Sequence, residues 1–446
     1  MKSSWRNQST KFALVSKLQC QPPPAWRWRL IFLLFCVFLT SGCSELRQRA
    51  VALWPFGNAA TATPSAANPI SLLGWAGTDA ENAHLQQAIL TFEGTHTNWR
   101  VAGLLVPDYT TALEEELASA NPPDIFLAYS HQLADLVAEG HLLPIPQSYP
   151  VANAIAPNLV NGLQVDGQNY CFPRDVSLLS LFYNRAVFDR VGAAYPQSGW
   201  SWNDLRAALE ATADMNNGYY GMALDYDLSR FYPFLLQSSS DDDLWQGPDA
   251  IAALEYFMDL YNDGLVAEPG TLDSTWNGEA FGRGRAAMTI EGNWLVGYLA
   301  SEFPALDYGI VELPIGSAGR ATTAFISCWV VNASTSDPTT ALELASFLTS
   351  SPVVSAWSSI SGNLPPSLEQ AATWTTNHPD SMTFVSALPN AVPWTGPAGF
   401  VDQAETVNMG MRMWYDDNMT TPDLIARLAI MSQDPPLPLP TATPSD

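Results

Sequence analysis

The chain has 446 residues, enough for two or three ordinary domains, and 47% of them are hydrophobic, which excludes a chain disordered throughout. Its formal net charge is −25 although only 14% of the residues are charged. Every lysine lies within the first 17 residues, so residues 44–446 hold 13 Arg and no Lys against 44 acidic residues. A body this acidic repels phosphate backbones, which excludes a nucleic-acid partner. Without lysine it cannot be a P-loop NTPase or a Schiff-base enzyme.

Residues 1–43 have the order of an export signal: basic residues, then the apolar run 30–39, then small residues before Cys43. The small residues followed by cysteine resemble a bacterial lipobox, although Thr40 stands where that pattern usually has Leu. The resemblance implies cleavage before Cys43 and lipidation of its thiol. The alternative is an ordinary signal or a membrane anchor in which Cys43 is incidental. The basic start predicts that the body lies outside the cytoplasm. The lipobox resemblance implies that it is anchored to the cell membrane.

Two segments flank the folded part. Residues 44–69 are rich in Pro, Ala and Thr and predict a flexible tether. Residues 433–446 are rich in Pro and predict a disordered, extended tail. We therefore expect the fold to lie between residues 70 and about 432.

The folded part alternates strand-like and helix-like segments, which predicts the α/β class. In chain order, we expect strands at 70–75, 101–106, 124–128, 176–183, 286–290, 308–313 and 325–331. We expect helices within 85–92, from a capping box at 111–114, within 133–139, and from residues 201, 248, 337 and 421 onward. No internal repeat is visible.

Several motifs carry a family resemblance. The most specific is F-G-R-G-R-A-A-M-T-I-E-G-N-W at 281–294. Others are D-G-Q-N-Y-C-F-P at 166–173, the Y-N-R-A-V-F run at 183–188, and P-D-I at 123–125 with G-H-L-L-P at 140–144. In this order and spacing they resemble the family 1 extracellular solute-binding proteins of ABC importers, the maltose-binding-like group. A further match is W-N-D-L at 202–205. Gln168 departs from the pattern's Lys, and Ser201, which precedes W-N-D-L, departs from its Thr.

The resemblance implies a two-lobe, periplasmic-binding-protein-like α/β fold of type II, with crossing strands as a hinge and a ligand cleft between the lobes. The crossings would fall near Pro173, near Ser327 and around residues 380–390. Residues 70–172 plus 328–385 would form lobe 1, and residues 173–327 plus 386–432 lobe 2. The implied partners are a carbohydrate ligand and the membrane subunits of an ABC permease, and we expect a monomer.

Two cysteines, Cys171 and Cys328, remain after the leader. An oxidising exterior permits a disulfide between them, and the alternative is two small buried hydrophobic side chains. The resemblance implies that they lie on neighbouring crossing strands.

A sugar site needs flat aromatic faces and a few fixed polar groups, because sugars present C–H faces and hydroxyl rims. Aromatic candidates, which fall at strand ends or in loops, are Trp75, Tyr129, Tyr232, Trp245, Trp276, Trp294 and Trp394. Polar candidates are Asp79, Asp175 and Glu291, and Arg174 could orient a carboxylate. The alternative for each is a packed ring, a helix cap or a solvated charge.

Signatures of enzymes are absent from the sequence: it has no Gly-x-Ser-x-Gly, no His-Glu-x-x-His and no nucleotide-binding glycine loop. Its five histidines show no tight spacing for a metal, and we expect neither metal nor cofactor. The leading hypothesis is a sugar receptor that delivers its ligand by hinge closure. Three alternatives stay open: the same fold binding a cation such as a polyamine, a secreted glycosidase, and a sensor subunit for a membrane kinase.

Overall fold

The computed structural model describes residues 69–214, 217–239, 244–416 and 418–432. All of them belong to one compact unit, Ser65–Asp446. The expected signal at 1–43 with Cys43, all but the last residue of the 44–69 tether, and the 433–446 tail lie outside the described residues.

The strands follow the expected order. They are β1 (Ile70–Trp75), β2 (Val101–Val106), β3 (Ile125–Tyr129), β4 (Gln164–Val165), β5 (Gln168–Asn169), β6 (Phe172–Asn184), β7 (Tyr220–Ala223), β8 (Val266–Ala267), β9 (Ala286–Gly292), β10 (Tyr308–Val311), β11 (Thr322–Val331) and β12 (Ala391–Pro393).

The helices alternate with these strands up to β11 and dominate after it. They are α2 (Asp79–Thr95), α3 (Tyr109–Leu117), α4 (Leu133–Ala138), α5 (Arg185–Val191), α6 (Trp202–Thr212), α7 (Leu228–Ser238), α8 (Gly247–Asn262), α9 (Asn277–Gly282), α10 (Trp294–Glu302), α11 (Pro338–Leu348), α12 (Ser351–Ser361), α13 (Leu368–Trp374), α14 (Met382–Ala387), α15 (Phe400–Tyr415) and α16 (Thr421–Leu428).

One large sheet connects most strands in the order β2-β1-β3-β11-β6-β9-β7-β8, with β10 on β6 and β12 on β11. At one end β1 is parallel to β2 and β3, and at the other β7 is parallel to β8 and β9. We call the part around β1–β3 lobe 1 and the part around β7–β9 lobe 2. The mixed α/β class expected from the alternating segments is confirmed. The residue limits expected for the lobes stay a prediction.

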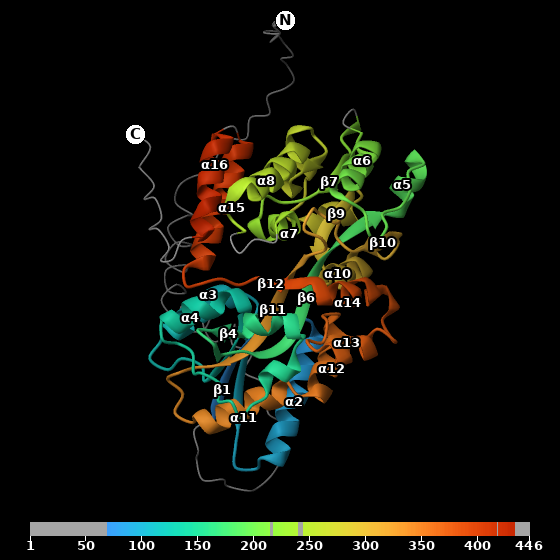
Figure 1. Cartoon of the computed structure of the whole chain (residues 1–446). Helices are drawn as coiled ribbons and strands as arrows, with labels where there is room; N and C mark the ends of the chain where they lie inside the picture. Colours follow the sequence, from blue (N-terminus) through green and yellow to red (C-terminus); the bar gives the residue numbers. More distant parts are fainter. Residues whose placement is uncertain (1–68, 215–216, 240–243, 417, 433–446) are drawn as a thin grey trace, which may run out of the picture. The chain divides into compact units, whose positions relative to one another are not determined.

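Two strands pass between the lobes, β6 and β11 (Figure 1). The first part of β6 pairs with β11, and its second part pairs with β9 and β10. β11 in turn pairs with β3 in lobe 1 and, at its other end, with β12. Almost every residue of β6 is buried, which explains why the mostly apolar run at 176–183 does not alternate with charged residues, since a strand covered on both faces has no solvent-facing side.

Cys171 and Cys328 form a disulfide, with 2.05 Å between the sulfurs. Both side chains are fully buried. Cys171 directly precedes β6, and Cys328 lies on β11 opposite Pro173. The bond therefore ties the two crossing strands together on the lobe 1 side.

Helix starts show where local chemistry decides and where it does not. Ser201 caps α6 with a reciprocal capping box to Asp204, as its sequence predicts. The capping box expected at 111–114 is wrong, because α3 begins two residues earlier, at Tyr109. In lobe 1, Thr78 and Glu81 form a capping box at the start of α2.

The apolar core lies on both sides of the crossing strands. In lobe 1 it packs α2 and α11 against the sheet around Phe92 and Trp329. In lobe 2 it packs α6, α7 and α8 around Phe231 and Phe257. Among the helices of the described residues, none has both the length and the apolar character that crossing a membrane requires.

Candidate functional site

A cavity of about 650 Å³ lies at the carboxyl ends of β1 and β3. Because these strands are parallel neighbours, their last residues, Trp75 and Tyr129, come to the same edge of the sheet, the usual place for a ligand in such a fold. The aromatic side chains that line the cavity are Trp75, Tyr129, Trp294, Phe325, Trp329 and Trp357. The charged or polar ones are Thr78, Glu81, Asn82, His84, His131, Arg174, Asp175, Ser177 and Asn363.

The loop from β1 to α2 forms one rim of the cavity. Thr78 N donates to Glu81 Oε2 at 2.6 Å, and Glu81 N donates to Thr78 Oγ1 at 3.3 Å. Asn82 closes the same loop through two 3.0 Å hydrogen bonds with the backbone of Gly77. These bonds fix the chain just after Trp75, whose side chain is 52% exposed. A large indole is thus held in the open at the cavity rim, where no core requires it.

Asp175, Arg174 and Trp357 form the polar floor of the cavity. Asp175 is 3% exposed, and its Oδ2 accepts from Arg174 Nε at 2.9 Å and from Trp357 Nε1 at 2.8 Å. The Arg174 guanidinium carbon lies 4.3 Å from the centroid of the Trp357 ring. The two charges compensate each other, so this buried pair adds no net charge to the cavity.

Two histidines and a tyrosine add polar atoms to the lobe 1 wall. His131 stacks on Tyr129, with 5.6 Å between ring centroids. Burial lowers the pKa of His131 to about 4 and also lowers the pKa of His84, so both rings are neutral at pH 7. Burial raises the pKa of the Tyr129 phenol, which stays protonated. The wall therefore presents neutral rings to a ligand.

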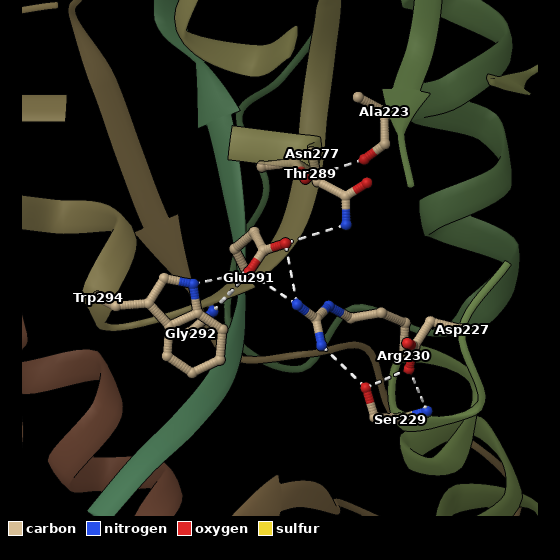
Figure 2. Close-up of polar contacts among 9 residues, drawn as sticks. All are labelled: Ala223, Asp227, Ser229, Arg230, Asn277, Thr289, Glu291, Gly292 and Trp294. Atoms are coloured by element: carbon tan, nitrogen blue, oxygen red, sulfur yellow. Dashed lines mark hydrogen bonds and ion pairs between the residues drawn. The ribbon is translucent and has the colours of Figure 1, made fainter. Parts of the chain in front are cut away.

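Trp294 brings lobe 2 to the cavity, and Figure 2 shows the polar network behind it. Trp294 Nε1 donates to Glu291 Oε2 at 2.9 Å. Arg230 Nη2 donates to both Glu291 oxygens at 3.0 Å, and Asn277 Nδ2 donates to Oε1 at 2.9 Å. Glu291 is 1% exposed and does not line the cavity.

This architecture, two lobes joined by crossing strands over an aromatic cavity, can be compared with known families. The sequence profile described as "Bacterial extracellular solute-binding protein" matches residues 87–383, which is more than half of the chain. The chain belongs to this family. The family resemblance drawn from the sequence motifs is confirmed.

Solved structures share the fold of this solute-binding protein. An ABC substrate-binding protein of Listeria monocytogenes in complex with cycloalternan has a TM-score of 0.69 and 19% identity, covering 81% of this chain and 96% of its own. A cyclic α-maltosyl-1,6-maltose binding protein of Arthrobacter globiformis has a TM-score of 0.68 and 19% identity, covering 82% and 97%. The multiple sugar-binding protein of Streptococcus mutans is 20% identical over 263 residues, which are 54% of this chain and 61% of the relative. The expected two-lobe, periplasmic-binding-protein-like fold is confirmed.

The structure places five of the sequence candidates together in the cavity: Trp75, Tyr129, Arg174, Asp175 and Trp294. Asp79 is exposed on the first turn of α2, beside the cavity-lining Thr78. Trp276 packs edge-to-face on Tyr298, at 4.7 Å between ring centroids, and does not line this cavity.

The other three aromatic candidates gather in lobe 2. The Tyr232 ring lies 5.4 Å from that of Trp245 and 5.0 Å from that of Trp394. Tyr232 and Trp394 are buried, and burial raises the pKa of Tyr232 to about 12. None of the three lines the 650 Å³ cavity, so nothing here assigns them to a ligand.

Sequence reasoning did not single out Trp357, His84 or His131. Trp357 lies on α12, among small and apolar residues that predict an ordinary amphipathic helix. Its role becomes visible when α12 packs on β6 and brings the indole to Asp175. Within the described part of the chain, no three side chains of His, Cys, Asp or Glu converge as a metal site would require.

Proposed function

We propose that this solute-binding protein captures a carbohydrate in the 650 Å³ cavity and delivers it to the membrane subunits of an ABC importer. The observation that carries the proposal is the lining itself: indole and phenol rings stand around a floor whose charges are already paired. Rings of this kind stack on the C–H faces of sugars, and the fixed polar atoms bind hydroxyls. The cycloalternan complex of one structure with this fold, and the sugar in the name of another, support the same ligand class.

We propose Trp75, Tyr129, Asp175 and Trp294 as ligand-contacting residues, joined by Trp357 and Arg174. Ligand contact stays a prediction for the other candidates, Asp79, Tyr232, Trp245, Trp276, Glu291 and Trp394. The pairing of Arg174 with Asp175 favours a neutral ligand over a polyamine, because a cation would meet the guanidinium beside the carboxylate.

The ligand would contact both lobes at once, since Trp75 belongs to lobe 1 and Trp294 to lobe 2. Binding then favours a closed arrangement by the differential contacts it adds, with β6 and β11 as the flexing strands. Lipidation at Cys43 would keep the receptor on the extracytoplasmic face of the cell membrane, near the permease. No catalytic step is part of this role.

Isothermal titration with a panel of mono- and oligosaccharides tests the proposal. Wild type is expected to bind at least one of them, with little dependence on salt, whereas a polyamine would bind more weakly as salt rises. Trp75→Ala is expected to reduce the affinity about tenfold through lost stacking. Tyr219→Ala, another exposed aromatic that does not line the cavity, is the matched control and should bind as wild type. Failure of every carbohydrate to bind refutes the ligand class.

A further inference from the structure

The carboxylate of Glu291 is fully occupied by protein donors. Arg230, Asn277, Trp294 and the backbone N–H of Gly292 together donate five hydrogen bonds to its two oxygens. A buried carboxylate with that many donors has no free lone pair to offer a sugar hydroxyl. Any effect of Glu291 on a ligand must therefore pass through a neighbour, and Trp294 is the neighbour that lines the cavity.

The Trp294 ring is held from several directions. Its Nε1 is tethered to Glu291, and its ring meets Phe325 at 5.8 Å between centroids, with an interplanar angle of 64°. The guanidinium carbon of Arg230 lies 5.7 Å from the ring centroid. The ring also lies directly over the backbone of Gly292, where an added Cβ would come within 2.1 Å of a ring carbon. These contacts fix both side-chain torsions of Trp294 before any ligand arrives.

The residues that hold the Trp294 indole are in turn anchored in helices of lobe 2. Arg230 lies in the first turn of α7, where its Nη1 donates to Ser229 Oγ at 2.9 Å, and Asp227 caps the same helix (Figure 2). Asn277 is the first residue of α9, and Trp294 is the first residue of α10. Glu291 thus joins the starts of three helices beside the carboxyl end of β9.

The charge of the network is balanced. Burial opposes the charge of Arg230, but the Glu291 and Asp227 carboxylates outweigh this effect and raise its pKa. Arg230 therefore stays a cation, and Glu291 needs it, because a buried carboxylate without a partner would be strongly unfavourable. An ion pair at this place supplies an acceptor for the indole N–H that cannot rotate away.

We propose that Arg230 and Glu291 are positioning residues: they hold the Trp294 indole in the orientation at which a sugar ring stacks on it. This inference deepens the proposed function and rests on it. A ring that is fixed in advance spares the ligand the ordering of a large side chain on binding, which is worth roughly three- to tenfold in affinity.

The double variant Arg230→Met/Glu291→Met tests this, because it removes both charges together and so avoids leaving one buried charge unpaired. Glu291→Gln is the second variant, with one carbonyl oxygen left for four donor groups. The matched control is Gln237→Met, which removes the side-chain acceptor of another indole, that of Trp202, at 2.7 Å. Neither Gln237 nor Trp202 lines the cavity. Each variant is measured by carbohydrate titration and by the ¹H–¹⁵N indole spectrum, with the Trp294 signal assigned from its loss in Trp294→Phe.

The double variant is expected to lose roughly three- to tenfold in affinity and to shift the Trp294 indole signal away from its hydrogen-bonded position. In the Trp294→Phe background the same double change should alter affinity less than twofold, since the ring through which it acts is gone. Gln237→Met should shift the Trp202 signal and leave affinity unchanged.

Two results overturn the inference. One is an unchanged Trp294 signal in both Arg230→Met/Glu291→Met and Glu291→Gln; the other is an affinity loss that is equally large in the Trp294→Phe background. If wild type binds no carbohydrate while the Trp294 signal still shifts in the Arg230 and Glu291 variants, the proposed function fails, but the positioning of the Trp294 indole by these two residues is supported.

Discussion

The disulfide between Cys171 and Cys328 offers the most quantitative test of the fold. The two residues are 157 positions apart. Closing an interval of that length removes about 17 cal/mol/K of chain entropy from the unfolded state, or ~5 kcal/mol at 25 °C, in the chain-entropy treatment. Both side chains are buried in the core, so Cys171→Ala/Cys328→Ala also loses a little packing. We expect the double variant to unfold with a free energy lower by about 3–5 kcal/mol.

Urea unfolding followed by far-UV circular dichroism measures this difference, with and without dithiothreitol. Dithiothreitol should destabilise wild type by a similar amount and leave the double variant unaffected, which serves as the internal control. If wild type and variant unfold within ~1 kcal/mol of each other, the loop-closure reasoning is refuted. Free thiols found at Cys171 and Cys328 in the native protein by mass spectrometry would refute the pairing itself.

Three further predictions concern the cavity. Trp357→Phe removes the indole N–H from a buried carboxylate, and we expect a loss of about 1.5–3 kcal/mol in unfolding free energy by urea titration, with weaker carbohydrate binding; an unchanged stability would contradict the bond. Gly292→Ala should displace the Trp294 ring and weaken binding. Gly297→Ala, in α10, meets only open space and should stabilise the protein by roughly 0.5–1 kcal/mol in thermal unfolding; equal effects of the two substitutions would count against the close packing of Trp294 on Gly292. Because burial lowers the pKa of His131 to about 4 from its usual 6.5, the unfolded chain binds the proton more readily, so stability is full above about pH 6.5 and falls as the pH drops towards 4. The loss should be about 2 kcal/mol between pH 7 and pH 5, and His131→Phe should remove this contribution to the slope; an unchanged slope would contradict it.

The fold was predictable to the extent that periodicity and motif spacing reflect burial. β1 begins and ends where its apolar run does, and β6 contains the expected run because both of its faces are covered. α7 was not expected, since Pro233 lies inside it and proline normally argues against a helix interior. Its position is decided by packing of the helix on α8, which local sequence does not encode.

The cavity was predictable where it is built from strand ends. Trp75 and Tyr129 end parallel strands, so strand order alone brings them together. Trp245 and Trp394 look equivalent to Trp75 in the sequence, yet they pack with Tyr232 in lobe 2. Local sequence does not encode which distant residues a loop tryptophan contacts. Trp357 was missed for the converse reason, since a ring on a helix resembles a core residue until its indole N–H meets a distant carboxylate.

The strand order has a consequence for how the chain can fold. Lobe 1 contains β1, β2 and β3, but its sheet is completed by β11, which ends only at Val331. About three quarters of the chain must therefore be synthesised before β3 can pair with β11. Until then the exposed edge of β3 is open to other pairings, so a holding chaperone that binds the first 320 residues would protect the step at which this molecule is most vulnerable.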